Sequence, residues 1–285
     1  MPFTIGSGDL SELVLSFNGW YYYYNMFNMP NDFSIVKCSI ERDGVAYTPV
    51  TFSGSRTKVI AAGDIDIQSD AILPSAFGLA SFARGTKFWI RLEYSVASVG
   101  MTWPTGGMLY SRARSGALSV RLGAGNDVAA VDAFGTMTYT TGVVNQARPY
   151  NPIVLGRFAS GDPKTVIGIG DSILDGVGDT LSGYSVRGFG QALFDADHVS
   201  NPIGGANFGL SGGTSAYWAG AGSDRLTSYL KYAKYALDEN ETNRINGNTQ
   251  LATAQSETLA LWSACASNGI NSILRTKLIP RTSGS

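Results

Sequence analysis

One short stretch of the sequence combines residue types that could carry out chemistry: TVIGIGDSILDGVGD, residues 165–179. In it an apolar run ends in Gly170, Asp171 and Ser172. A serine hydroxyl becomes a nucleophile when a base accepts its proton and nearby N–H groups stabilise the oxyanion that forms. Serine is also a favoured helix N-cap, so Ser172 could instead cap a helix that follows a strand. The stretch alone leaves both interpretations open.

Three other uses of these glycines and acids each lack a required residue. A dinucleotide-binding fingerprint needs a third glycine where Ile173 stands, and a phosphate-binding P-loop needs a Gly-Lys-Ser or Gly-Lys-Thr sequence. An enzyme that forms an aspartyl-phosphate on Asp171 needs a second acid two residues later, but Ile173 stands at that position. We therefore expect no cofactor at this stretch, and the two interpretations of Ser172, nucleophile and helix cap, stay open.

The second half of the chain alternates between patterns typical of strands and patterns typical of helices. The expected elements are a strand at 165–170, a helix near 187–197, a strand near 206–211, a helix at 216–234, an irregular strand at 235–240, a helix at 251–267 and a strand at 271–280. This alternation predicts a parallel sheet with right-handed crossovers and helices on both faces. Loops that follow the strands of such a sheet line its binding crevice, and Ser172 lies in one of them.

The first half has the two-residue period of strands. Val36, Cys38 and Ile40 would share one face, and Asp43-Gly44 favours a tight hairpin turn because both residue types tolerate positive φ.

A second run, KFWIRLEY, predicts a strand with one buried and one solvent-exposed face. The buried face would carry Phe88, Ile90, Leu92 and Tyr94, and the exposed face Trp89, Arg91 and Glu93. Several such strands separated by turn residues predict a β-sandwich or jelly roll. We thus expect an all-β domain over residues 1–158 and an α/β domain over residues 159–285.

Two segments carry a resemblance to a known family. GDSILDGVGD, residues 170–179, resembles block I of the SGNH (GDSL-type) hydrolases, and NFGLSGGTS, residues 207–215, resembles their block II. The likeness covers roughly residues 163–280, and the first half resembles the β-rich domain that precedes the hydrolase domain in some bacterial and phage members. It implies a flavodoxin-like three-layer domain and a serine esterase activity.

The resemblance also implies a role for each matching residue. Ser172 would be the nucleophile, and the backbone amides of Ser172 and Gly209 would donate to the oxyanion. Asn243 would supply a third donor from block III, and Asp171 would anchor the loop.

Block III departs from the family pattern, which expects Gly-x-Asn-Asp after an apolar strand. In YALDENETNRING, Glu241 replaces the glycine and Arg244 replaces the aspartate, while Asp238 and Glu239 interrupt the apolar run. An extra carboxylate beside an oxyanion opposes catalysis unless Arg244 neutralises it.

The Asp-x-x-His block that supplies the family's base has no match before Ser285. The one histidine, His198, precedes block II and fits a residue at the end of a surface helix. Without a base a serine is a poor nucleophile. We therefore expect a domain shortened at its C-terminus, unless the gene continues beyond this sequence.

Two functions follow as alternatives. The first is a serine esterase for O-acetyl groups on a polysaccharide, for which the aromatic tract at residues 17–30 would offer a sugar-stacking surface. The second is a catalytically inactive structural or carbohydrate-binding protein, such as a phage virion component, on the same scaffold. In that case the tract would pack into the core and between subunits.

The composition of the chain limits the kinds of binding partner that we expect. The net charge of -1 gives no reason to expect nucleic acid or an anionic membrane. The sequence has no signal-peptide pattern and no apolar run long enough to span a bilayer, so we expect cytoplasmic synthesis and a protein that is free or virion-associated.

Cys38 and Cys265 are expected to be buried free thiols, with no metal site. Self-association or assembly into a particle is expected to cover open sheet edges.

Overall fold

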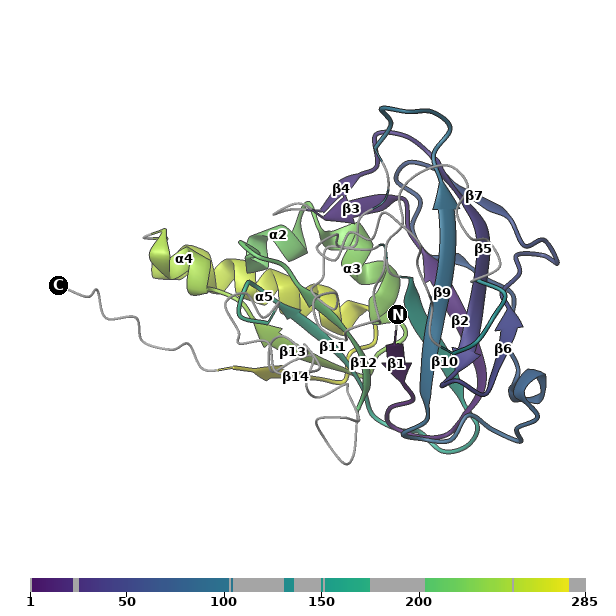
Figure 1. Ribbon diagram of the computed structural model, residues 1–285. Helices are drawn as coiled ribbons and strands as arrows, with labels where there is room; N and C mark the ends of the chain where they lie inside the picture. The colour runs from purple at the N-terminus through teal and green to yellow at the C-terminus, as the bar shows by residue number, and fades with distance from the viewer. Residues whose placement is uncertain are drawn as a thin grey trace.

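The computed structural model describes residues 2–22, 26–102, 104, 131–135, 150, 152–174, 203–247 and 249–276 (Figure 1). The helix expected near 187–197 and His198 lie outside the described residues.

Two antiparallel sheets make up the part of the chain before residue 159. The larger has the order β1-β9-β5-β6, with β7 also paired to β5, and the smaller has the order β10-β2-β8. A separate hairpin joins β3 to β4. The strands are β1 (Pro2–Thr4), β2 (Leu10–Phe17), β3 (Trp20–Tyr22), β4 (Met26–Asn28), β5 (Phe33–Arg42), β6 (Ala46–Pro49), β7 (Lys58–Ile60), β8 (Ile67–Gln68), β9 (Lys87–Ser95) and β10 (Ile153–Phe158), and a 3-10 turn, η1, spans Pro74–Phe77.

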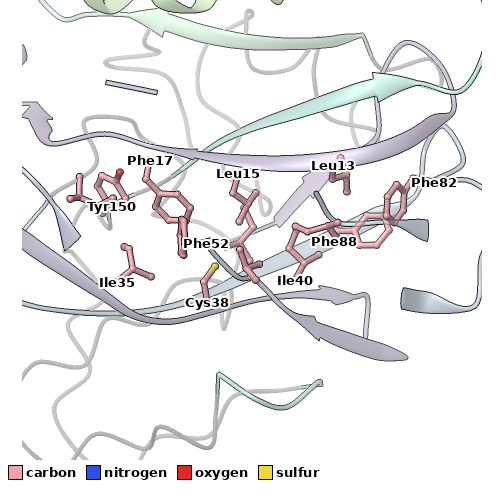
Figure 2. Packing of buried hydrophobic residues seen from close by; sticks show 14 of the residues in the cluster. Leu13, Leu15, Phe17, Ile35, Cys38, Ile40, Phe52, Phe82, Phe88 and Tyr150 are labelled. Carbon is pink, nitrogen blue, oxygen red and sulfur yellow. The ribbon is translucent and has the colours of Figure 1, made fainter. Parts of the chain in front are cut away.

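These two sheets enclose one apolar core. Figure 2 shows Leu13, Leu15 and Phe17 of β2 across from Ile35 and Cys38 of β5, all of them without exposed surface. Each fully buried aliphatic or aromatic side chain contributes about 1.5–3 kcal/mol relative to an exposed one. The assignment as a β-sandwich or jelly roll, and the boundary at residue 158, stay predictions.

The expected hairpin forms between β5 and β6, and its turn residues Asp43 and Gly44 both have positive φ, 21° and 78°. The expectation that Val36 shares the buried face of β5 with Cys38 and Ile40 is wrong. A bulge between Ile35 and Lys37 shifts the register, so Ile35 rather than Val36 joins Cys38 in the core. A bulge inserts one residue into the two-residue period, which the sequence pattern did not reveal.

On β9 the expected inner face packs in the core, but the other face is not uniformly exposed. Arg91 is only 5% exposed, because the described segment 131–135 lies over this part of the sheet. Segment 131–135 is held by ion pairs from Lys37 and Arg56 to Asp132. The expectation of an exposed Arg91 is therefore wrong.

The second part contains a parallel sheet of the order β12-β11-β13-β14. Its strands are β11 (Thr165–Gly170), β12 (Gly204–Gly209), β13 (Tyr235–Glu239) and β14 (Ser272–Arg275). Numbered along the chain, the order is 2-1-3-4, the arrangement that begins a flavodoxin-like sheet. The predicted α/β class with a parallel sheet is thus found.

The described helices are α2 (Ser215–Ala219), α3 (Ser223–Leu230), α4 (Thr242–Asn246) and α5 (Leu251–Ser267). Figure 1 shows α2, α3 and α5 together on one side of the parallel sheet, where they share a core with β11–β13. Helix α5 coincides with its predicted range, as expected for a segment rich in Ala and Leu. The second helical layer predicted for a three-layer domain falls on residues outside the described part.

The single helix predicted for 216–234 is instead two helices. Helix α2 ends at Gly220, and α3 begins after Gly222. A Cβ at Gly222 would lie 2.5 Å from the Tyr217 ring, so the chain passes too close to that ring for a side chain. None of the described helices combines the length and apolar character required to cross a bilayer.

The aromatic tract at 17–30 contributes to both cores where it is described. Phe17 is buried in the β core, whereas Trp20 is partly buried against the α/β core and lies 6.0 Å below the guanidinium of Arg225. Arg225 also donates to the main-chain oxygen of Met26 and the side chain of Asn28, which joins the two parts of the chain.

Candidate active site

The loops that follow β11 and β13 meet at one edge of the parallel sheet. The two strands are neighbours, with Gly170 opposite Glu239, and Gly170 also lies opposite Gly209 of β12. The chain leaves β11 toward β12 and leaves β13 toward β14, in opposite directions. Ligands of open α/β sheets bind at such a switch point. Ser172 lies two residues beyond β11, at this switch point.

Hydrogen bonds to buried acids shape the turn that carries Ser172. Asp171 and Leu174 donate their N–H groups to the Glu239 Oε2 atom at 3.3 and 3.2 Å, and Ile173 N–H donates to Asp171 Oδ1 at 2.9 Å. Asp171 N–H also contacts the Glu239 main-chain oxygen at 3.1 Å. The N–H of partly exposed Ser172 has no partner among the described residues. Within the described part of the chain, this is the one amide of the turn that remains available to bind an oxyanion.

Gly209, the second expected oxyanion donor, is already engaged. Its N–H donates to Asn207 Oδ1 at 2.8 Å, while the Asn207 Nδ2 atom donates to the Leu174 main-chain oxygen at 3.0 Å. The Gly209 amide can reach an oxyanion only after Asn207 releases it. The sequence analysis missed Asn207, although it is the first residue of the block II segment.

Asn243 lies beside Asp171, but its amide is also engaged. Nδ2 donates to Asp171 Oδ2 at 3.3 Å and to the Gly213 main-chain oxygen at 3.0 Å. Asn243 thus joins the three loops that follow β11, β12 and β13. Its role as a third oxyanion donor, which requires it to give up one of these contacts, stays a prediction.

Glu241 occupies a backbone conformation that favours glycine. Its φ is 86°, in the left-handed region, and glycine is the residue that the family pattern expects at this position. Arg244 does not neutralise this carboxylate, since its guanidinium forms an ion pair with Glu257. Glu241 Oε1 instead accepts a hydrogen bond from Thr258 at 3.3 Å.

We expect Glu241→Gly to have a free energy of unfolding about 1 kcal/mol higher than Glu241→Ala. Both variants lose the carboxylate, so their difference isolates the cost of a Cβ at this φ value. Urea unfolding measured on the two variants side by side tests this. Equal midpoints would show that the strain at this position is negligible.

Asp238 is a charged residue within β13, and partners from β14 and α5 compensate its burial. Its side chain is fully buried, forms an ion pair with Arg275 of β14, and accepts a hydrogen bond from the Trp262 indole at 2.8 Å. The strand is therefore regular from Tyr235 to Glu239, rather than irregular as expected.

Glu239 points to the opposite side of the sheet, where it meets Asp171. Burial and the neighbouring Asp171 charge raise the pKa of Glu239 to about 8. The protonated form of Glu239 is therefore favoured at neutral pH. Among the described residues, no three His, Cys, Asp or Glu side chains converge as a metal-binding group.

A cavity of about 830 Å³ lies away from Ser172. It is lined by β10 and by the beginnings of β11 and β12, including Leu155, Val166 and Gly205. This is the amino end of the parallel strands, opposite the switch point.

Comparisons with known proteins give little further information. No protein-family model and no curated protein matches this chain. Among solved structures, the psychrotrophic esterase EstA from Pseudoalteromonas sp., crystallised inhibited by monoethylphosphonate, aligns with a TM-score of 0.35 and 22% identity. The alignment covers 41% of this chain and 61% of the esterase chain.

Proposed function

We propose that this chain is an SGNH-type serine esterase-like protein with Ser172 as its nucleophile. One observation supports the proposal: Ser172 lies at the switch point, in a turn whose other amides are bound by acids, while its own N–H has no partner among the residues that the structure describes. A nucleophile whose backbone amide also binds the oxyanion fits this arrangement.

In the proposed reaction, Ser172 Oγ attacks the ester carbonyl carbon and its proton passes to a base. The tetrahedral oxyanion accepts a hydrogen bond from Ser172 N–H, and from Gly209 once Asn207 has rotated away. Collapse of this intermediate expels the alcohol, and water then hydrolyses the acyl-enzyme. His198, the chain's one histidine, lies outside the described residues, so no described group is assigned as the base.

The proposed substrates are O-acetyl esters of polysaccharides. The resemblance to the family and the aromatic tract support this class. Phe27 of the tract is 43% exposed and could contact a sugar ring.

Hydrolysis of p-nitrophenyl acetate tests the proposal. We expect Ser172→Ala to lower kcat/KM by at least about 10³-fold, because loss of a nucleophile removes the acyl-enzyme route. Ser256→Ala, on the exposed surface of α5, serves as the matched control and should retain the native rate. Equal rates for the native chain and Ser172→Ala would overturn the proposal.

The alternative is a catalytically inactive structural or carbohydrate-binding protein, for example a virion component that assembles with copies of itself. The engaged amides of Gly209 and Asn243 favour it, because two of the three expected oxyanion donors are occupied. A folded native chain that does not hydrolyse the ester, and that binds polysaccharide or sediments as an oligomer, would favour this alternative.

A further inference from the structure

The buried carboxyl of Glu239 contacts the turn on both sides of Ser172. Glu239 is the last residue of β13 and is 5% exposed. Its Oε2 atom accepts from the residue before Ser172 and from the second residue after it, Asp171 and Leu174. No group of the proposed reaction uses this carboxyl.

We propose that Glu239 is a positioning residue for Ser172 that acts in its protonated form. In that form its carboxyl accepts from the two amides and donates its proton to the Asp171 carboxylate. Loss of the proton to solvent places two charges side by side and loosens the turn. The inference rests on the proposed function of Ser172 and adds a pH-dependent control of it.

The charges around Glu239 favour this behaviour. Asp171 faces it from the turn after β11, and Glu241 lies two residues later in the chain. Asp238 points to the other side of the sheet, where Arg275 neutralises it. The cation of α4, Arg244, is paired with Glu257 of α5. No cationic side chain of the described part contacts either Glu239 or Asp171, so within that part no counterion offsets a second negative charge.

The hydrogen bonds from the Asp171 and Leu174 amides favour the charged form of Glu239, but burial and the Asp171 charge oppose it more strongly. The pKa of Glu239 rises to about 8, chiefly because burial penalises the charge and next because Asp171 repels it. A raised carboxyl pKa means that the folded state holds the proton more tightly than the unfolded chain, so stability falls as pH rises from about 4.5 toward 8.

The consequence for Ser172 follows from the contacts of Asp171. Asp171 also binds Ile173 N–H and the Asn243 amide, so its displacement would disturb the loops that follow β11 and β13. The free N–H of Ser172 would then lose its fixed direction.

Hydrogen–deuterium exchange of the peptide that contains residues 171–174 tests the inference directly. The native chain is compared with Glu239→Gln at each pH from 6 to 10, which cancels the intrinsic pH dependence of exchange. Glutamine keeps an acceptor for the two amides and a donor to Asp171, and stays neutral. We expect the native peptide to exchange increasingly faster than the variant's, with a midpoint near pH 8. A native-to-variant ratio that does not change with pH would overturn the inference.

The rate of reaction with a fluorophosphonate probe, measured over the same pH series, is the functional arm. We expect this rate to fall above about pH 8 in the native chain but not in Glu239→Gln. Parallel pH profiles for the two chains would also overturn the inference. A native chain that never reacts, yet shows the expected exchange, would instead contradict the proposed function of Ser172 while leaving Glu239 as the residue that holds the turn.

Discussion

Replacement of Gly170 by alanine is expected to lower the free energy of unfolding by about 1–3 kcal/mol and to displace the Ser172 turn. A Cβ at this position would lie 2.7 Å from the Leu174 Cβ and 2.8 Å from the Glu239 main-chain oxygen. Neither atom is the end of a flexible side chain, so the clash can be relieved only by a shift of the backbone. That shift would separate the turn from Glu239.

Gly168→Ala is the matched control, two residues earlier on the same face of β11. There the nearest atom is the end of the Leu174 side chain, at 3.2 Å, which can rotate away. We expect it to lose less than about 1 kcal/mol and to keep the reactivity of Ser172. Urea unfolding and ester hydrolysis measured on both variants distinguish them. Similar losses in the two would mean that the close approach at Gly170 is unimportant.

Arg91→Met is expected to cost about 3–5 kcal/mol of unfolding free energy, because it leaves the Glu41 carboxylate buried without a counterion. The two side chains are each 5% exposed, and Arg91 Nε donates to Glu41 Oε2 at 2.8 Å. The pair also holds the covering segment: Arg91 donates to the Gly135 main-chain oxygen, and Glu41 Oε1 accepts from Gly135 N–H at 2.7 Å.

The double variant Arg91→Met/Glu41→Met separates the stranded charge from the lost packing. We expect it to be more stable than Arg91→Met alone, since replacing both members of a buried ion pair by apolar residues is often nearly neutral. Urea unfolding of the native chain, Arg91→Met, Glu41→Met and the double variant completes the cycle. An Arg91→Met chain within about 0.5 kcal/mol of the native one would show that this pair behaves as an exposed ion pair does.

The sequence predicted the features that depend on neighbours in the chain. The Asp43-Gly44 turn, the inner face of β9, helix α5 and the parallel character of the second sheet all follow from local periodicity. Features that depend on distant residues were missed. Arg91 is buried because segment 131–135, some forty residues away, covers it, and no pattern within β9 indicates this cover.

In the candidate site, too, the features set by neighbours in the chain could be predicted, and those set by distant residues could not. Its location after β11 could be predicted, because a serine that follows a buried strand lies at the carboxyl end of the sheet. The partners of its amides could not, since they depend on the register that puts Gly170 opposite both Glu239 and Gly209. From the sequence, Glu239 was an interruption of an apolar strand, whereas in the fold it contacts the turn of Ser172.

Mapping of a fluorophosphonate adduct by peptide mass spectrometry directly tests whether Ser172 is the nucleophile. We predict one modified peptide, which contains Ser172, and no modification in folded Ser172→Ala at the same probe concentration. A folded native chain that reacts only at another residue, or that does not react at all, would contradict it.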